Sequence, residues 1–391
     1  MAETADVVII GGGVTGCSIA YHLVQRGVRN VAVLEKSFLA SGATGKSSAC
    51  IRQHYSTPET CRMVLRSLRF FETFAERTGG RSASFVRVGY LLGVDERLHA
   101  QMLESVALQE AVGIDTRLVS PEEMREIEPR LRVDDFVGGC YEPESGYADP
   151  SGTAQGFAGA ARDGGARILE QTEVLGVEVA GCRVTGVRTS RGAIHAPVVV
   201  NAAGTWGDRI GRMVGVEIPI AVCRHKINFV TRPPGAAAPH PLVYDFVRNI
   251  YTRPETGGLT LVGPLESKVE DPVDPDRYDE GVTFAETLDA MERTAHRFPV
   301  MEQGEVVRGY AGCFDVTPDW HPILDESPVG GFFLSVGFSG HGFKLSPAVG
   351  DTMAKLVVEG KGPNDDVHAF RLSRFAEGKP IRGTYGDWLM C

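Results

Sequence analysis

The stretch that decides the fold is Val7-Val8-Ile9-Ile10-Gly11-Gly12-Gly13-Val14-Thr15-Gly16, at the start of the chain. Four apolar residues predict a buried strand, and a helical pattern runs from Val14 to about Arg26. The three spaced glycines suit a bound dinucleotide. Gly11 permits a tight turn, Gly13 lets a pyrophosphate approach the backbone, and Gly16 lets the helix pack closely on the strand. A phosphate would then lie at the helix N-terminus, where free N–H groups favour anions.

A second buried strand follows the helix. The run Val31-Ala32-Val33-Leu34 predicts this strand, and Glu35 closes it about 20 residues after the last glycine. A carboxylate at that point accepts hydrogen bonds from ribose hydroxyls. Strand, helix, second strand and acid together predict a nucleotide-binding βαβ unit, and a glycine-rich turn without a ligand fits this context poorly. The unit does not distinguish NAD from FAD.

Composition sets the broad class of the protein. With 391 residues the chain is longer than one typical core, so two domains are expected. A formal charge of -10 and 43% hydrophobic residues indicate an ordinary globular protein and give nucleic acid no basic surface to bind. We find no apolar run long enough to cross a bilayer and no room for a signal peptide before the first strand, so we expect a cytoplasmic protein.

Cysteines and histidines give no sign of a metal site. The eight cysteines have no CxxC spacing, and the ten histidines show no paired ligand spacing. We therefore expect neither a metal centre nor a disulfide framework.

The order of elements predicts a mixed α/β chain in which a nucleotide-binding domain is interrupted twice. Residues 37–57 are rich in small and hydroxyl side chains and read as a loop near the pyrophosphate. A strand is predicted over Gly192 to Val200, and it runs into the small-residue turn Ala203-Gly204-Thr205-Trp206, which is suited to contact a cofactor. We assign residues 1–85, 146–216 and 306–391 to a discontinuous Rossmann-like domain. Residues 86–145 and 217–305 are assigned to a substrate domain built on an antiparallel sheet.

A second glycine-rich cluster lies near the C-terminus, from Val336 to Pro347, and reads VGFSGHGFKLSP. Ser346 and Pro347 form an N-cap and first-turn pair, so a final helix is expected to begin there. The turn would bring backbone N–H groups, a helix N-terminus and Lys344 together. Positive potential at that point would stabilise the N1 and O2 edge of a reduced flavin, which nicotinamide does not need. A plain strand-to-helix turn with an exposed lysine is the alternative interpretation.

Taken together, these segments resemble the sarcosine oxidase and glycine oxidase group of the D-amino-acid-oxidase-like FAD-dependent oxidoreductases. The resemblance covers nearly the whole chain. It is carried by the glycine unit with Glu35, Ser41-Gly42-Ala43-Thr44 with Ser47-Ser48, Arg52-Gln53-His54-Tyr55, the turn at Ala203, Thr317-Pro318-Asp319, and Gly337 to Lys344. It implies FAD, a discontinuous FAD-binding domain and an antiparallel substrate-domain sheet that shields the isoalloxazine ring.

The resemblance also implies which residues hold the cofactor. These are Gly11, Gly13, Val14, Thr15 and Gly16 at the pyrophosphate; Glu35, Lys36 and the backbone of Val174 at the adenosine; Ser41, Gly42, Thr44, Ser47 and Ser48 in the loop; Ala203, Gly204 and Trp206 in the turn; and Gly312, Gly337, Phe338, Gly340, His341, Gly342, Phe343 and Lys344 at the flavin.

Four residues are candidates for catalysis. Arg52 and Lys344 match the pair that grips the substrate carboxylate in sarcosine-oxidase-like enzymes, and a guanidinium with an ammonium suits that ion. A salt bridge to a loop acid is the alternative role for Arg52. His341 is a candidate hydrogen-bonding residue or a packed turn histidine. Tyr251 ends a loop, from Tyr244, that would shape the pocket for the nitrogen substituent.

Two positions depart from the family pattern. Some relatives bind FAD covalently through a cysteine, but here Gly312 occupies that position and Cys313 follows it, so we expect non-covalent FAD. The oxidases also carry a lysine in a Gly-Leu-Lys-Leu strand where this chain has Thr260. That change argues against fast use of oxygen, unless Lys226 or Lys268 substitutes.

The expected activity is oxidation of the C–N bond of a secondary amine acid, such as an N-substituted glycine, by hydride transfer to flavin N5 with hydrolysis of the resulting imine. The electron acceptor would be oxygen or a carrier. Two alternatives stay open at this stage. One is a D-amino-acid dehydrogenase, and the other is an FAD-binding beta-type or accessory subunit of a hetero-oligomeric dehydrogenase.

Overall fold

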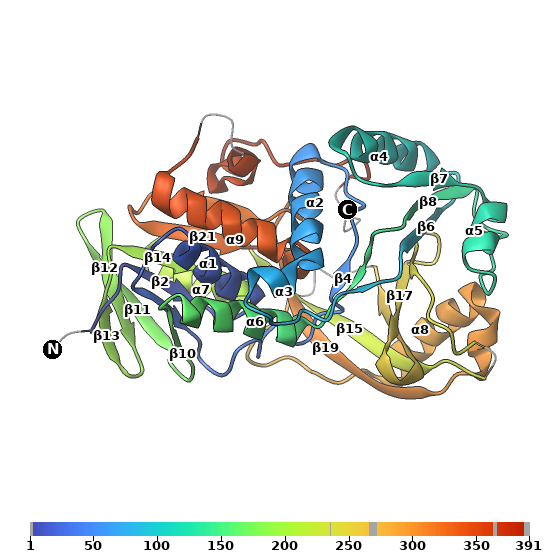
Figure 1. The fold of residues 1–391 in the computed structure, drawn as a ribbon, viewed down its shortest axis with the longest axis horizontal. Helices are drawn as coiled ribbons and strands as arrows, with labels where there is room; N and C mark the ends of the chain where they lie inside the picture. Colours follow the sequence, from blue (N-terminus) through green and yellow to red (C-terminus); the bar gives the residue numbers. More distant parts are fainter. Residues whose placement is uncertain (1–2, 235, 266–271, 363–365, 387–391) are drawn as a thin grey trace.

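The structure is a computed structural model that describes residues 3–234, 236–265, 272–362 and 366–386. The N-terminal βαβ unit has the predicted order, and its strands lie at the centre of a sheet (Figure 1). Six described strands form this sheet, in the order β10 (Arg167–Leu169), β3 (Val31–Leu34), β2 (Val7–Ile10), β14 (Val198–Asn201), β21 (Phe332–Val336) and β20 (Ile323–Glu326). All neighbours are parallel except β20, which is antiparallel to β21.

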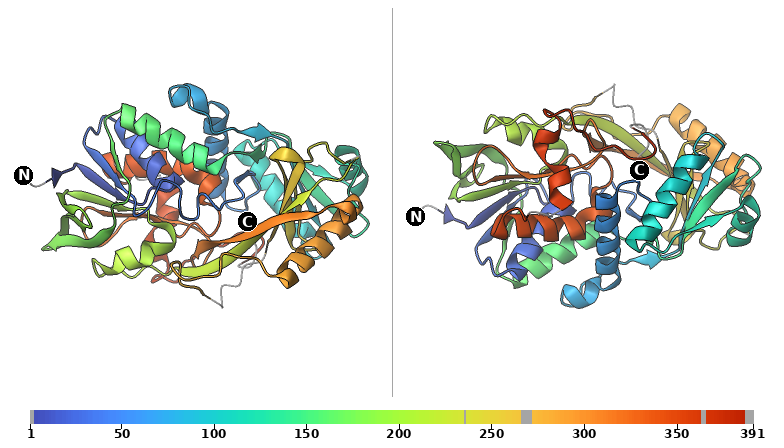
Figure 2. Two further views of the ribbon diagram at one scale, coloured as in Figure 1. Left: turned by 90° about the horizontal axis from the view of Figure 1, so that it is seen from below. Right: turned by 90° about the horizontal axis from the view of Figure 1, so that it is seen from above.

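Both faces of this sheet are covered. On one side pack α1 (Val14–Gln25), α6 (Pro150–Asp163) and α9 (Gly342–Glu359), which lie side by side in both views of Figure 2. On the other side lies a four-stranded sheet of β1 (Glu3–Thr4), β13 (Gly192–His195), β12 (Arg183–Thr189) and β11 (Val174–Ala180). Burial on both faces explains why β2 and β14 are continuous apolar runs and do not alternate.

Two sequence expectations in this half are wrong. The strand predicted over Gly192 to Val200 is two strands in two different sheets, β13 and β14, and they are separated at Ala196-Pro197. The final helix begins at Gly342, not at the Ser-Pro pair, so Pro347 lies inside α9. Pro347 has no N–H for the carbonyl of Phe343, and the Ser346 hydroxyl donates to that carbonyl over 2.8 Å instead.

The second large sheet has eight described strands, drawn on the opposite side of Figure 1. Their order is β19 (Val306–Val316), β15 (Ala221–Thr231), β18 (Leu259–Pro264), β17 (Ile250–Glu255), β16 (Leu242–Asp245), β6 (Tyr90–Val94), β8 (Gly138–Glu142) and β7 (Arg117–Val119). The expected antiparallel pairing holds for every neighbouring pair except β16 and β6, which are parallel. The domain boundaries proposed from the sequence stay predictions, and β19 pairs within this sheet.

Helices cover the rim of the second sheet. They are α4 (His99–Val112), α5 (Pro121–Ile127) and α8 (Phe284–Arg297), while α2 (Pro58–Glu72) and α3 (Phe74–Arg77) lie nearer the centre of the molecule. Two of these helices begin with a capping box, α5 at Ser120 and α8 at Thr283. The small sheet of β4 (Cys50–Ile51), β9 (Gly146–Tyr147) and β5 (Val86–Arg87) leads the chain into the region between the two large sheets. None of the described helices combines the length and apolar character needed to cross a membrane.

Candidate active site

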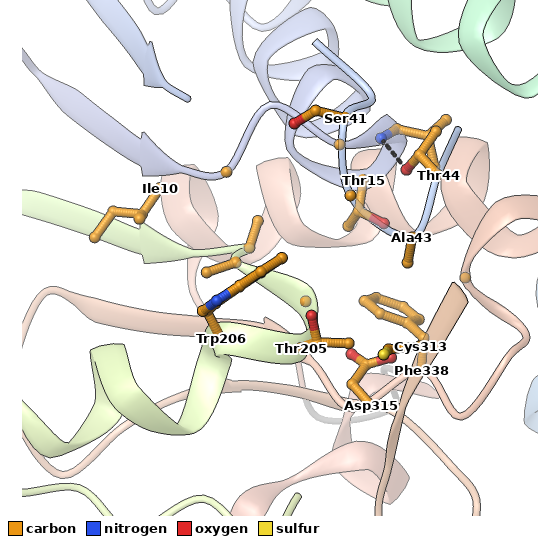
Figure 3. Close-up of a pocket in the computed structure, with 18 of the residues that line it drawn as sticks. Ile10, Thr15, Ser41, Ala43, Thr44, Thr205, Trp206, Cys313, Asp315 and Phe338 are labelled. Carbon is orange, nitrogen blue, oxygen red and sulfur yellow. Dashed lines mark hydrogen bonds between the residues drawn. The ribbon is translucent and has the colours of Figure 1, made fainter. Parts of the chain in front are cut away.

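A cavity of about 450 Å³ extends from the end of β2 to the start of α9 and is bordered by β15 and β19 (Figure 3). Most of the predicted cofactor residues line it. They are Gly11, Gly13, Val14, Thr15, Glu35, Lys36, Ser41, Gly42, Thr44, Ser47, Ser48, Val174, Ala203, Gly204, Trp206, Gly312, Phe338, Gly340, Gly342 and Phe343. Segments more than three hundred residues apart in the sequence, at Gly11 and at Phe343, thus border one cavity.

The three glycines of the first turn differ in what surrounds them. Gly11 has φ +112°, and a Cβ there would lie 2.4 Å from the carbonyl oxygen of Ala202, so only glycine fits. A Cβ on Gly16 would lie 2.0 Å from the oxygen of Gly11, which explains the tight packing of α1 on the strand. Gly13 meets only the Thr44 hydroxyl, at 3.2 Å, and faces the cavity. Thr44 also accepts a hydrogen bond from the Val14 amide at 3.0 Å, drawn as a dashed line in Figure 3.

At one end of the cavity, Glu35 and Lys36 follow β3. The Glu35 carboxylate accepts from the amides of Gly12 and Ser37, each at 2.8 Å, which fixes it beside the glycine turn. The Lys36 ammonium lies 3.6 Å from the Trp206 ring centroid and pairs with Asp276 at 2.9 Å. The indole nitrogen of Trp206 donates to the same carboxylate at 3.0 Å, so these three side chains border this end of the cavity.

At the other end, the turn between β21 and α9 is held by Asp315 of β19. Its carboxylate accepts from the Gly337 amide at 2.8 Å, and its carbonyl accepts from the Ser339 amide at 3.1 Å. Burial raises the pKa of the Asp315 carboxyl to about 6, and hydrogen bonds from the amides of the turn oppose that rise. Gly337, with φ +73°, does not line the cavity itself and permits the sharp turn that places Phe338 and Gly340 there.

The shape and lining of this cavity fit FAD. Three features border the cavity in turn. They are the Glu35 carboxylate, which suits a ribose, the glycine turn at the N-terminus of α1, which suits a pyrophosphate, and the turn of backbone amides at the N-terminus of α9. Ser335 and His225 both line the cavity, and their Oγ and Nδ1 are buried polar atoms with no hydrogen-bond partner among the described residues. A dinucleotide with a polar ring system offers the hydrogen-bonding groups that such atoms need.

The predicted carboxylate-binding pair lies behind the cavity wall. Arg52 is only 2% exposed, and its guanidinium carbon lies 4.6 Å from the Tyr55 ring and 5.5 Å from the Tyr244 ring. Lys344 is buried in the first turn of α9. Burial lowers the pKa of His341 well below its usual value, and the charges of Lys344 and then Arg52 lower it further. The two cations therefore share the surroundings of one neutral imidazole, although neither lines the cavity in the described structure.

The other predicted catalytic residues also have defined partners. His341 caps α9, and its Nδ1 lies 3.0 Å from the hydroxyl of Tyr55. Tyr251 on β17 is buried, and its ring stacks on Tyr244 with centroids 5.2 Å apart. Burial raises the pKa of the Tyr251 hydroxyl, so this side chain stays protonated near neutral pH.

Sequence reasoning missed His225. This residue of β15 lines the cavity, lies flat against the Phe314 ring with centroids 4.3 Å apart, and places Nε2 3.2 Å from the Tyr251 hydroxyl. Burial, followed by the charge of Lys226, lowers the pKa of His225 to about 3. The ring is therefore neutral, and its buried Nδ1 has no hydrogen-bond partner among the described residues. The pattern of the sequence held no signal for it, because it is a lone histidine in an apolar strand.

The positions that depart from the family pattern can also be located. Thr260 is hydrogen-bonded to His240 at 3.0 Å and does not line the cavity. Lys226 pairs with Glu286 of α8 at 3.0 Å and is likewise absent from the cavity wall, whereas Lys268 lies outside the described residues. Gly312 and Cys313 both line the cavity.

Comparison with known proteins defines the class. The model of the family described as FAD dependent oxidoreductase (DAO) matches residues 6–356, and the chain belongs to this family. The chain is 30% identical over 385 residues to human mitochondrial sarcosine dehydrogenase, with 96% of this chain and 42% of that protein aligned. It is 28% identical to the sarcosine oxidase subunit beta of an Arthrobacter species, with 97% of this chain and 93% of the subunit aligned. The chain thus spans less than half of the first protein and nearly all of the second.

Solved structures support the same class. L-proline dehydrogenase from P. horikoshii has a TM-score of 0.90 and 30% identity, with 97% of this chain and 100% of that chain covered. Glycine oxidase from Geobacillus kaustophilus has a TM-score of 0.83 and 27% identity, with 95% and 99% covered. The expected family, the mixed α/β fold and the FAD cofactor are therefore confirmed, and the chain is a member of the FAD-dependent oxidoreductase family.

Proposed function

We propose that this oxidoreductase oxidises the C–N bond of a secondary amine acid, such as an N-substituted glycine. The observation that carries this proposal is the buried pair of cations, Arg52 and Lys344, which share the surroundings of the neutral His341 next to a cavity that the neutral His225 ring lines. An amino acid carries a carboxylate and an ammonium a few ångströms apart, and the two kinds of group suit these two kinds of partner. The similarity to proteins named for sarcosine, glycine and L-proline supports the same substrate class.

In the proposed mechanism, the cations bind and orient the substrate carboxylate. The Arg52 guanidinium is flanked by the Tyr55 and Tyr244 rings, so its orientation is fixed before a substrate binds. Lys344 supplies a second positive charge from the first turn of α9. Because both groups are buried, their attraction for a carboxylate is screened less than it would be in water.

His225 keeps the amine side of the cavity uncharged. Its ring lines the cavity, and its Nε2 is held by the Tyr251 hydroxyl. Because burial lowers the pKa of His225 to about 3, the ring takes up no proton at neutral pH, and the amine loses its proton to solvent as the substrate binds. The residues that line the cavity would hold FAD, which would supply the two-electron acceptor for the hydride on the carbon beside the nitrogen. The resulting imine is hydrolysed by water to an amine and an aldehyde or oxo acid.

We also propose that the preferred electron acceptor is a carrier and not oxygen. The lysines and arginine that line the cavity within the described residues are each paired with a carboxylate: Lys36 with Asp276, Lys46 with Glu280, and Arg209 with Asp274 and Asp276. Positive charge near the ring favours reduction of oxygen, and a paired ammonium supplies less of it. Slow peroxide formation together with fast reduction of an artificial acceptor is the expected result. Peroxide formed at the rate of substrate turnover would refute this proposal.

The test of the substrate class is anaerobic mixing of the purified yellow protein with a panel of amino acids. N-methylglycine, other N-substituted glycines and L-proline should bleach the flavin absorbance, whereas the matched primary amino acids should do so more slowly. If only primary D-amino acids bleach it, the D-amino-acid dehydrogenase alternative is correct. If none of the panel does, an FAD-binding subunit without this activity is favoured, and size-exclusion of the native assembly follows.

A further inference from the structure

The last described segment, residues 366–386, lies beside residues that we propose to bind the substrate. The family match stops at residue 356, whereas the described chain continues to residue 386. The amide of Ile381 donates to Asp319 at 2.9 Å, and the Thr384 hydroxyl lies 2.6 Å from that of Ser105 on α4. Tyr385 follows, is only 4% exposed, and packs edge-on against Phe246 with ring centroids 5.5 Å apart. The segment thus spans from the β20 side of the molecule to the second sheet.

Tyr385 holds the imidazole of His54. The Tyr385 hydroxyl lies 2.7 Å from His54 Nε2, which is a short hydrogen bond between two buried groups. On the other side of the ring, Gln109 Nε2 donates to the Tyr55 carbonyl at 2.8 Å and to His54 Nδ1 at 3.1 Å. Burial, followed by the charge of Arg52, lowers the pKa of His54 to about 3, so the ring is neutral. Because Nδ1 accepts from Gln109, Nε2 carries the proton and donates it to the Tyr385 oxygen.

His54 in turn holds Arg52. The carbonyl oxygen of His54 accepts a hydrogen bond from Nη1 of Arg52. The His54 ring also stacks on Tyr90, whose ring lies 5.0 Å from that of Tyr244. Fixing the His54 ring at both nitrogens therefore limits the rotation of the peptide group that holds the guanidinium.

We propose that Tyr385 is a positioning residue for the substrate carboxylate, acting through His54 on Arg52. The inference rests on the proposed function, because it assigns Arg52 to the carboxylate. It adds a determinant of substrate affinity that lies in the C-terminal segment, beyond the part of the chain that the family model matches.

The test uses the full-length holoprotein and four variants. Tyr385→Phe removes the hydroxyl and keeps the ring against Phe246. Thr384→Val removes the neighbouring hydrogen bond that anchors the same segment and does not touch His54, so it is the matched control. His54→Leu and the double variant His54→Leu with Tyr385→Phe complete a double-mutant cycle. Two ligands are titrated by the change in flavin absorbance or its bleaching: N-methylglycine, and methoxyacetate, which replaces the amine with an ether oxygen.

We expect Tyr385→Phe to weaken methoxyacetate binding and to raise the KM for N-methylglycine about five- to tenfold, the size of one lost hydrogen bond. The limiting rate of bleaching and the FAD content should change less than twofold. Thr384→Val should leave both ligand affinities unchanged, and Tyr385→Phe should add less than twofold in the His54→Leu background.

Equal effects of Tyr385→Phe and Thr384→Val, or full additivity with His54→Leu, would overturn the inference, because either result indicates a merely structural segment. These outcomes differ from a failure of the proposed function. In that case the wild-type protein is not bleached by N-methylglycine and does not bind methoxyacetate, and both proposals are refuted together.

Discussion

Gly13→Ala and Gly16→Ala each add one methyl group to the glycine turn, at positions three residues apart. We expect the first to weaken FAD binding and the second to lower the stability of the fold. Gly13 has φ -72°, which alanine adopts freely, and its new Cβ would meet only the Thr44 hydroxyl at 3.2 Å. The apoprotein should therefore keep its stability to within about 0.5 kcal/mol. The methyl group would project into the cavity where the pyrophosphate is expected to approach. We expect FAD to dissociate at least tenfold more readily, which corresponds to about 1.4 kcal/mol.

Gly16→Ala should affect folding instead. Its Cβ would lie 2.0 Å from the carbonyl oxygen of Gly11. Because both groups belong to the backbone, this clash cannot be relieved by rotation of a side chain. Opening this contact by about 1 Å belongs to the upper part of the usual overpacking range of about 1–3 kcal/mol. The better helix propensity of alanine offsets about 1 kcal/mol. A net loss of about 2 kcal/mol should lower the Tm of the apoprotein by about 2 °C, given the length of the chain.

The assay for both variants is thermal unfolding of the apoprotein, followed by titration with FAD and detection of the quenched flavin fluorescence. Wild-type FAD affinity in Gly13→Ala would refute the assignment of this residue to the pyrophosphate. Wild-type stability of the Gly16→Ala apoprotein would refute the packing argument. Gly13→Ala should change the FAD affinity alone, and Gly16→Ala should change the stability of the apoprotein. A general defect in the preparation would change both quantities in both variants, so it cannot produce this pattern.

Three further outcomes are expected. Arg52→Lys keeps the charge and loses the bidentate fork, so the substrate concentration for half-maximal anaerobic bleaching should rise about 30- to 150-fold; an unchanged value would remove Arg52 from the carboxylate site. Acid precipitation should leave the flavin in the supernatant, because Gly312 offers no sulfur, and flavin in the pellet would implicate Cys313. Burial lowers the pKa of His22 to about 4. As pH falls from 6.5 toward 4, the unfolded chain therefore binds a proton that the folded chain does not, and stability is lost at about 1.4 kcal/mol per pH unit for this group. Urea unfolding of His22→Leu at pH 7 and pH 5 should show a weaker loss, with the exposed His195→Asn as the control; an identical loss in His22→Leu would contradict this interpretation.

Local sequence patterns predicted the first half of the cofactor site well. The positions of Gly16 and Glu35 follow from contacts within one βαβ unit, because a Cβ on Gly16 would meet the Gly11 carbonyl of the same turn. Gly11 also belongs to this turn, although the atom that excludes a Cβ there is the Ala202 carbonyl, which follows β14. Glu35 is fixed to the Gly12 amide 23 residues earlier, a separation that the unit itself sets. Such features depend on short stretches of chain, so their spacing is visible in the sequence.

Pairing between distant segments was not predictable in the same way. The strand expected across Pro197 divides between two sheets, because each half finds a different partner, Val187 for Ile194 and Ile9 for Val200. The Ser-Pro signal for a helix start was overridden because burial of Lys344 and Leu345 extends α9 backwards by a full turn. Proline is tolerated inside the helix because the Ser346 hydroxyl donates a hydrogen bond to the Phe343 carbonyl, which the proline cannot do.

The charge balance of the region around Arg52 explains why buried neutral histidines suit the proposed chemistry. Burial, with the nearby cations, lowers the pKa values of His54 and His341, so these rings add no positive charge to that of Arg52 and Lys344. A carboxylate is therefore attracted, whereas the ammonium of the same molecule is repelled by the cations and poorly solvated. We expect the pKa of this ammonium to fall on binding, which makes loss of its proton to solvent easier. Loss of a hydride from the adjacent carbon needs the lone pair of an unprotonated nitrogen, so the burial that keeps the histidines neutral also favours the reactive form of the amine.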